Sequence, residues 1–318
     1  MNNFPKIVVI GGGTGIFSVL SGLKEKPVDL TAIVTMSDNG GSTGRLREEF
    51  GVLPPGDIRM ALVALSDSDQ SLAKLFNYRF NGNSLNHSFG NLFLLALADI
   101  KNSFSDGVKE AARILNVRGQ VLPVTLDDIE LVAELEDGRI IRGETNIDCP
   151  KHDSRLAIKR VFYDKACRIN PDVAPALAEA DLIIMGPGDL FTSIIPNLLV
   201  PGMKEALIES CSPKLYFCNL MTKAGETLGF RGEDFVQILE SYLKFDFFNW
   251  IVFNASQPSP ERIKKYEKEQ SSPVEYSVDF FNNRQAKIIE KDVLRKEGFI
   301  RHDFEKTAEV VMDIINKI

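Results

Sequence analysis

The stretch KIVVIGGGTG, residues 6–15, decides the fold. Residues 6–10 are a short β-branched run, which is typical of a buried strand, and the glycines that end it lead into a helical pattern over residues 14–23. A second β-branched run, LTAIVT, follows at residues 30–35. The order strand, glycine turn, helix and strand predicts a βαβ unit at the start of a parallel sheet.

The same pattern returns in the second half of the chain. Apolar runs at residues 182–185, 214–218 and 250–253 each end in glycine or asparagine, as strands of an α/β sheet do. Between the two halves, residues 120–165 hold short alternating runs and an Asp137-Gly138 hairpin signal. We therefore predict an α/β fold in which residues 1–318 form one Rossmann-like domain. Its sheet is doubly wound and mostly parallel, with an antiparallel β insertion at 120–165.

The composition excludes several classes of protein. Thirty-seven basic and 44 acidic residues give a net charge of −7, so the chain lacks the positive field that nonspecific nucleic-acid binding uses. The longest apolar run, residues 92–98, is far shorter than the ~18 residues of a membrane-spanning helix. No secretory signal pattern is present at the N-terminus. We expect a cytoplasmic protein with no membrane span and no nucleic-acid partner.

Neither metal ligands nor a catalytic group can be assigned from known motifs. The four cysteines and three histidines lack metal-ligand spacing. The sequence contains neither G-x-S-x-G nor H-E-x-x-H. No metal site is predicted, and the catalytic residues, if any, stay unassigned.

The first candidate binding segment is the glycine turn after the first strand. Glycines let a ligand approach the backbone, and the free N–H groups at the start of a helix attract phosphate. The match to G-x-G-x-x-G is imperfect, because the third glycine position is Ile16 or Ser18, and no lysine follows as in a P-loop. A tight turn without a ligand is the alternative. The predicted ligand-binding residues are Gly11, Gly12, Gly13, Thr14 and Gly15.

The second candidate segment follows the second strand and is expected at the same carboxyl edge of the sheet. Asp38 offers a carboxylate to a hydroxyl or a cation, and Asn39 follows it. Gly40 and Gly41 offer backbone N–H groups. The alternative is a solvated turn that leads into a helix. Further along, Asp57 is interpreted as the N-cap of a helix over residues 58–65.

A second anion-binding turn is predicted in GPGDLFTSIIPN, residues 186–197, which also joins a strand to a helix. Its candidate residues are Gly186, Gly188, Asp189, Thr192 and Ser193. At the other strand ends, Asn219, Thr222 and Asn254 offer polar groups, although turn formation explains Asn254 equally well. Asn91 lies in an apolar stretch, residues 88–100, interpreted as a buried central helix. A buried amide needs partners, and a ligand is one candidate.

Several segments together resemble the gluconeogenesis factor family. These are GGGTG at 11–15, DNGGSTGRLREEFGVLPPGDIR at 38–59, HSFGN at 87–91, GPGDLFTSIIPNLLVPG at 186–202 and CNLMTKAGET at 218–227. The family is the YvcK-like branch of the CofD-like superfamily, whose other branch is 2-phospho-L-lactate transferase. The resemblance covers nearly the whole chain in order.

The resemblance implies a Rossmann-like cytoplasmic protein that binds the nucleotide sugar UDP-N-acetylglucosamine and requires no cofactor. It implies a role in cell shape and wall synthesis during growth on gluconeogenic carbon, exerted through a protein partner; a homo-oligomer is compatible with the sequence. It also implies that residues 11–15, Asp38, Asn219 and the 186–193 turn face the ligand. Arg301 matches a family arginine implicated in binding.

Two enzymatic alternatives stay open beside this regulatory role. The transferase branch implies divalent-metal-assisted transfer of a phospholactyl group to a deazaflavin precursor. The family loop usually carries two adjacent acids, and here Asn39 follows Asp38, which weakens a Mg²⁺ site built from oxygen ligands. An NAD-dependent oxidoreductase is the weaker alternative, because the glycine fingerprint is imperfect. We expect a non-catalytic binding protein, with Mg²⁺ relevant only to the transferase alternative.

Overall fold

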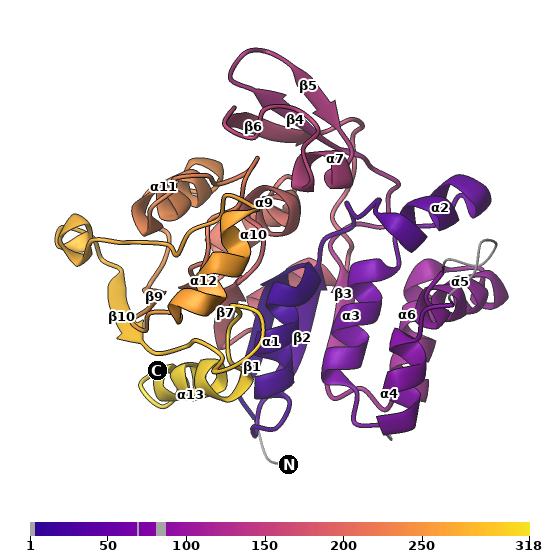
Figure 1. The fold of residues 1–318 in the computed structure, drawn as a ribbon. Helices are drawn as coiled ribbons and strands as arrows, with labels where there is room; N and C mark the ends of the chain where they lie inside the picture. The colour runs from indigo at the N-terminus through magenta and orange to yellow at the C-terminus, as the bar shows by residue number, and fades with distance from the viewer. Residues whose placement is uncertain (1–3, 69, 81–86) are drawn as a thin grey trace.

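The computed structural model of the chain describes residues 4–68, 70–80 and 87–318. Its main feature is a seven-stranded sheet with the order β10-β9-β8-β7-β1-β2-β3, in which all neighbouring strands are parallel (Figure 1). The strands are β1 (Lys6–Gly11), β2 (Asp29–Val34), β3 (Gln120–Pro123), β7 (Leu182–Met185), β8 (Lys214–Phe217), β9 (Trp250–Asn254) and β10 (Lys287–Lys291).

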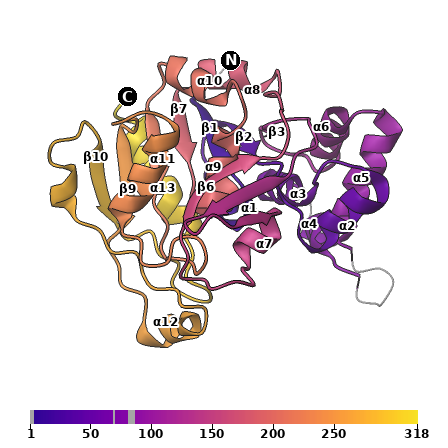
Figure 2. The same ribbon diagram turned by 90° about the horizontal axis from the view of Figure 1, so that it is seen from above.

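Helices cover both faces of this sheet. Because the chain runs outward from β1 in two directions, right-handed crossovers place the helices that connect β1, β2 and β3 and those that connect β7, β8 and β9 on opposite faces, and the final helix α13 returns to the face of α1. α1 packs against α3 and α13, whereas α10 packs against α8 and α9 (Figure 1, Figure 2). The helices are α1 (Gly13–Leu23), α2 (Gly41–Phe50), α3 (Gly56–Leu65), α4 (Gln70–Asn77), α5 (Phe89–Lys101), α6 (Phe104–Ile114), α7 (Glu144–Asp148), α8 (Val173–Ala178), the π-helical turn η1 (Leu190–Ile194), α9 (Ile195–Leu198), α10 (Met203–Glu209), α11 (Gly232–Tyr242), α12 (Pro260–Glu267), the 3₁₀ turn η2 (Val278–Phe281) and α13 (Phe304–Ile315).

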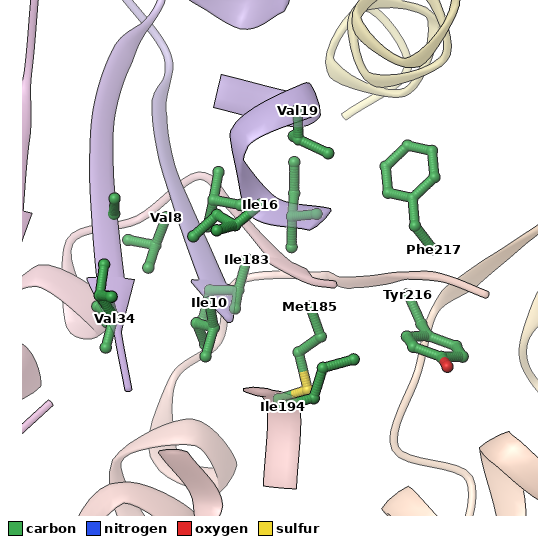
Figure 3. Packing of buried hydrophobic residues seen from close by; sticks show 14 of the residues in the cluster. Val8, Ile10, Ile16, Val19, Val34, Ile183, Met185, Ile194, Tyr216 and Phe217 are labelled. Carbon is green, nitrogen blue, oxygen red and sulfur yellow. The ribbon is translucent and has the colours of Figure 1, made fainter. Parts of the chain in front are cut away.

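The position of β1 explains its sequence. It lies between β2 and β7, and from Ile7 onward its residues are buried, so an uninterrupted β-branched run suits it. The sheet reverses its winding between β1 and β7, which is where α/β folds bind ligands. Figure 3 shows the packing of buried side chains from β1, α1 and β7, among them Val8, Ile10, Ile16, Val19, Ile183 and Met185.

A small antiparallel sheet projects beyond the edge of the main sheet at which the carboxyl ends of its strands lie (Figure 1). It has the order β5-β4-β6 and consists of β4 (Leu131–Leu135), β5 (Ile140–Arg142) and β6 (Ile158–Tyr163). The predicted start of the insertion at residue 120 is wrong, because β3 pairs in parallel with β2 in the main sheet. A four-residue run offers too few positions to distinguish an antiparallel strand from the edge strand of a parallel sheet.

The apolar stretch at residues 88–100 is not the central helix that its composition predicts. It forms α5, which packs between α4 and α6 at the side of the molecule (Figure 2), and Ile100 is 70% exposed. Because α5 contacts helices on two sides, apolar residues occupy most of its circumference although it lies at the side of the molecule. Among the described residues, no helix combines the length and the apolarity needed to span a membrane.

The contact between α1 and α13 gives a test of the fold. A Cβ atom added to Gly22 would lie 1.9 Å from the backbone oxygen of Phe304, so α13 would have to move away. We expect Gly22→Ala to lower the free energy of unfolding by about 1–3 kcal/mol, the usual cost of overpacking. Urea unfolding measures this effect. Ser21→Ala on the same helix is the control, and equal stability of both variants would contradict the packing.

Candidate functional site

A cavity of about 390 Å³ lies over the carboxyl ends of the central strands. It brings together the two predicted glycine turns, the end of β8 and the segment before α13. Of the predicted residues, the cavity is lined by Gly12, Gly13, Thr14, Gly15, Gly188, Asp189, Ser193, Asn219, Thr222 and Arg301. These residues lie far apart in the sequence and meet because parallel strands end at one edge.

The first glycine turn has the geometry of an anion site. α1 starts at Gly13, whose backbone N–H bonds to the Asp57 carboxylate, and the N-cap residue Gly12 supplies no side-chain cap for the N–H groups that follow. Gly13 has a φ of +60°, a conformation that favours glycine. Gly15 is required for another reason, because a Cβ atom there would lie 2.1 Å from the oxygen of Pro187. Gly11, the last residue of β1, does not line the cavity.

The second turn lies against the first. Gly188, Asp189 and Ser193 line the cavity, but Gly186 and Thr192 lie behind it. Thr192 is buried and its hydroxyl donates a hydrogen bond to Glu226 at 3.1 Å. The helical turn η1 begins directly after Asp189. Three of the five predicted residues of the second site therefore line the cavity, and the other two lie outside its lining.

The polar residues that follow the other strands differ in position: Asn219 and Thr222 line the cavity, and Asn254 does not. Asn219, after β8, donates a hydrogen bond from Nδ2 to the oxygen of Gly188 at 2.9 Å. Thr222 accepts a hydrogen bond from the backbone of Ser272 at 2.9 Å, so its hydroxyl also fixes a loop. Asn254 bonds to Ser256 and Val293 and acts as a turn residue.

Arg301 lies in a loop that α12 holds in place. The guanidinium of Arg262 donates four hydrogen bonds to backbone oxygens of residues 295–299, at 2.8–3.3 Å. The hydroxyl of Tyr266 accepts a hydrogen bond from the backbone of Ile300 at 2.9 Å. Arg301 itself is exposed, with its guanidinium 5.4 Å from the ring centre of Phe299. The cavity wall thus includes Lys265 and Tyr266 of the charged helix α12, which are not among the predicted binding residues.

The residues of the second candidate segment lie beside the cavity but do not line it. Asp38 accepts a hydrogen bond from the backbone of Gly40 at 2.8 Å, and Asn39 accepts one from the backbone of Thr145 at 2.9 Å. Gly41 begins α2. Asp38, Asn39, Gly40 and Gly41 therefore form the loop and first residue at the N-terminus of α2 and are not part of the cavity lining.

Asn91 has a structural explanation within the protein. Its Oδ1 accepts a hydrogen bond from Nε of Arg59 at 3.0 Å, and its Nδ2 donates to the hydroxyls of Ser42 at 3.2 Å and Thr43 at 3.4 Å. Its amide needs no ligand as a partner. Asn91 ties α5 to the start of α2, since Ser42 and Thr43 belong to that helix.

Asp57 is a site residue that the sequence analysis interpreted differently. α3 begins at Gly56 after Pro55, so Asp57 lies in its first turn and not at the N-cap. A Cβ atom on Gly12 would lie 2.7 Å from the Asp57 carboxylate, which therefore lies directly behind the first glycine turn. Burial and the nearby charge of Asp38 raise the pKa of Asp57 to about 7, although a hydrogen bond from the Gly13 backbone opposes the rise. The position of Asp57 behind the first glycine turn follows from the packing of α3 and not from its local sequence.

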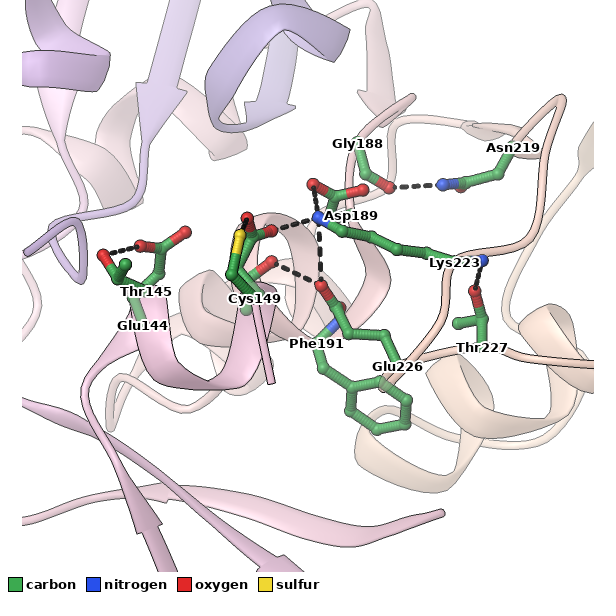
Figure 4. Close-up of polar contacts among 12 residues, drawn as sticks. Glu144, Thr145, Cys149, Gly188, Asp189, Phe191, Asn219, Lys223, Glu226 and Thr227 are labelled. Carbon is green, nitrogen blue, oxygen red and sulfur yellow. Dashed lines mark hydrogen bonds and ion pairs between the residues drawn. The ribbon is translucent and has the colours of Figure 1, made fainter. Parts of the chain in front are cut away.

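Lys223 joins three acidic residues at the edge of the cavity (Figure 4). Its Nζ contacts the carboxylate of Asp148, and it lies 2.8 Å from Asp189 and 3.5 Å from Glu226. Oxygens of these three carboxylates lie within 4.8 Å of one another, a spacing that suits a metal ion. Burial opposes the charge of the ammonium group, but the three carboxylates together raise the pKa of Lys223. The lysine cation therefore neutralises this cluster.

Glu226 and Glu144 carry less negative charge at neutral pH than exposed glutamates do. Burial raises the pKa of Glu226 to about 7, opposed by Lys223 and assisted by Asp189. Burial and the charge of Asp38 raise the pKa of Glu144, on α7, to about 9. Part of the acidic cluster therefore holds protons at neutral pH.

We expect Lys223→Met to lower the melting temperature, because three carboxylates lose their shared cation. Since the lysine side chain is 29% exposed, the loss should stay below the about 3–5 kcal/mol of a fully buried pair. Added Mg²⁺ should raise the melting temperature of Lys223→Met more than that of the parent. Lys264→Met on α12 is the control. A variant as stable as the parent would show that the cluster does not depend on Lys223.

Asp57 predicts a pH dependence of stability. Its folded pKa of about 7 lies above its ordinary value of 3.8, so folding favours the protonated carboxyl. This contribution is complete below the unfolded pKa and is lost as the pH rises through about 7. Between pH 5 and pH 8 the melting temperature of Asp57→Asn should therefore fall less than that of the parent. Asp106 is an exposed aspartate in the first turn of α6, and the melting temperature of Asp106→Asn should fall as much as that of the parent.

Comparisons with known proteins agree with this architecture. A family model described as 2-phospho-L-lactate transferase CofD matches residues 7–294. The gluconeogenesis factor of Bacillus subtilis is 45% identical over 323 aligned residues, with 100% of both chains covered. That of Listeria innocua is 39% identical over 316 residues, which cover 98% of this chain and 96% of the relative. A crystal structure of a Bacillus halodurans protein superposes with a TM-score of 0.93 at 40% identity, and covers 98% of this chain and 100% of that one.

Proposed function

The chain belongs to the CofD family, among relatives named gluconeogenesis factors, and on this basis we propose that it is a cytoplasmic binding protein for UDP-N-acetylglucosamine. In this proposal the protein is a regulatory sensor without a catalytic step. It supports cell shape and wall synthesis during growth on gluconeogenic carbon, by contact with a protein partner that reads the bound state.

One observation carries the proposal: two glycine turns meet on a single cavity, and each leads directly into a helical turn. The N–H groups of Gly13 and Phe191 bond to the carboxylates of Asp57 and Glu226, and the remaining N–H groups of these turns suit the oxygens of a pyrophosphate. Arg301 adds a planar set of donors that matches phosphate geometry. The cavity thereby combines backbone and side-chain donors for one anionic group.

Nucleotide binding in this proposal needs no cofactor and no metal ion. Asn39 bonds to the backbone of Thr145 where the family loop usually carries a second acid, and the cation among Asp148, Asp189 and Glu226 is Lys223. We expect the affinity for UDP-N-acetylglucosamine to survive chelation by EDTA. Isothermal titration of UDP-N-acetylglucosamine, NAD and GDP, each with EDTA or Mg²⁺, tests the ligand class and the metal requirement together.

The second candidate function is a CofD-type transferase, which the family match and one structural observation favour. Asp57 lies close enough to Asp38 for their charges to interact, so the region holds a pair of carboxylates despite Asn39. Hard oxygen ligands of this kind suit Mg²⁺. A steep loss of nucleotide affinity with EDTA, restored by Mg²⁺, would favour the transferase. Tight binding of NAD alone would favour the oxidoreductase.

Thr14 allows a test that separates binding from folding. It is exposed, lines the cavity and lies in the first turn of α1. In Thr14→Glu, the new carboxylate should stabilise the helix start but repel a bound phosphate. We expect an unchanged or higher melting temperature and at least a roughly tenfold weaker affinity, since 1.4 kcal/mol of repulsion suffices for that factor. Thr14→Gln is the neutral control, and equal affinities of both variants would remove this turn from the anion site.

Arg301 predicts a second effect on affinity. Arg301→Ala should weaken the binding of UDP-N-acetylglucosamine by roughly 1.5–3 kcal/mol, the usual contribution of a hydrogen bond to a charged group. Arg301→Lys should recover only part of this loss, because lysine lacks the planar fork of donors. The melting temperature without ligand should hardly change, since the side chain is exposed. Titration of Lys296→Ala, in the same loop, provides the control. A variant that binds as tightly as the parent would contradict the role of Arg301.

A further inference from the structure

Two residues that line the cavity, Asn219 and His302, each carry a buried hydrogen-bond acceptor without a donor among the described residues. Oδ1 of Asn219 and Nε2 of His302 are both buried, and neither has a hydrogen-bond partner among the described residues. Folded proteins pair most buried polar atoms, because an unpaired one costs stability. The two atoms belong to the region that the sequence analysis assigned to a ligand, although His302 was not among the predicted residues.

The amide of Asn219 has a defined orientation. Its Nδ2 donates to the oxygen of Gly188 at 2.9 Å, as Figure 4 shows. Since a carbonyl oxygen only accepts hydrogen bonds, the nitrogen of the amide must face Gly188 and the oxygen must be the atom left over. Oδ1 is therefore an acceptor, and a ligand atom that pairs with it must be a donor.

The same argument applies to His302. The side chain is 94% buried, since only 6% of its surface is exposed, and it bonds to the backbone of Cys218, next to Asn219. Burial lowers the pKa of His302 to about 4, so the ring is neutral at pH 7. A neutral imidazole has one donor nitrogen and one acceptor nitrogen. With the other nitrogen bonded to the backbone oxygen of Cys218, Nε2 is left as an acceptor.

The cavity thus combines two kinds of hydrogen-bonding group. The glycine turns and Arg301 offer donors, which suit phosphate oxygens. Asn219 and His302 offer acceptors, which suit the hydroxyl groups of a sugar. Asn219 also lines a second cavity of about 680 Å³ that adjoins the first, so the space beyond it accommodates more of an elongated ligand. We infer that Asn219 and His302 bind hydroxyl groups of a sugar ring adjacent to the pyrophosphate, an assignment that rests on the proposed function.

The inference makes His302 a specificity residue with a predictable pattern of affinities. His302→Phe keeps an aromatic ring but removes the acceptor. It should therefore lower the affinity for a sugar-bearing ligand by roughly 5- to 100-fold, the effect of breaking a buried hydrogen bond. Affinity for inorganic pyrophosphate, which has no sugar hydroxyl, should stay within about twofold. Asn219→Ala should show the same direction. His152→Phe is the matched control, because Nε2 of His152 is also buried and unpaired but lies outside the cavity lining.

Isothermal titration of parent and variants with four ligands tests this pattern. The ligands are UDP-N-acetylglucosamine, UDP, N-acetylglucosamine 1-phosphate and pyrophosphate. A His302→Phe effect confined to UDP and UDP-N-acetylglucosamine assigns the ribose, and one confined to the two ligands with N-acetylglucosamine assigns the hexosamine. Equal effects on pyrophosphate and the sugar-bearing ligands, or no effect on any, would overturn the inference.

A measurement on the parent protein covers the case in which His302→Phe does not fold. The ¹⁵N resonance of His302 Nε2 should shift when a sugar-bearing ligand binds and stay unchanged with pyrophosphate; an unchanged resonance with both would refute the inference. If the parent binds GDP but not UDP-N-acetylglucosamine, the proposed function fails, and the GDP-to-pyrophosphate comparison still decides the role of His302. If no sugar-bearing nucleotide binds, both proposals fail.

Discussion

The site depends on a backbone contact between two turns. Gly15 of α1 lies so close to the carbonyl oxygen of Pro187 that no side chain fits between them. This contact holds the β1–α1 turn against the β7–η1 turn at the point where the sheet reverses its winding. Further bonds support it: Asn219 holds the oxygen of Gly188, and Asn197 holds the oxygen of Gly11 at 3.3 Å. A methyl group at residue 15 would separate the turns and open the cavity on this side.

The charges around the turns follow a second constraint. Carboxylates crowd one side of the cavity, and a bound pyrophosphate would add negative charge. Raised pKa values at Asp57 and Glu226 and the cation of Lys223 reduce this repulsion. A buried carboxyl that is protonated carries no charge and costs less to bury than its ionised form. The protein therefore tolerates acidic residues beside the proposed anion site without a large net charge there.

Sequence patterns predict the central part of the fold better than its edges. β1 and its glycine turn combine a continuous β-branched run with a break, and few other structures suit that pattern. β3 has four residues and could not be assigned to the correct sheet before its pairing was known. The anion turns and Arg301 follow from local motifs and from the family resemblance. Asp57 and His302 do not, because their roles depend on what distant segments place beside them. α12 carries many charges and yet lines the cavity through Lys265 and Tyr266, while Arg262 holds the loop that precedes Arg301.

The order of the cavity residues along the chain has a consequence for synthesis. Gly12 and His302 lie far apart in the sequence and both line the cavity, and α13, which follows His302, packs on α1. During translation, the first glycine turn leaves the ribosome long before the residues that complete its surroundings. A growing chain that ends before residue 302 lacks part of the cavity wall, so a nucleotide that binds as proposed can stabilise only chains that extend past this residue. Ligand occupancy would then distinguish these chains from shorter fragments.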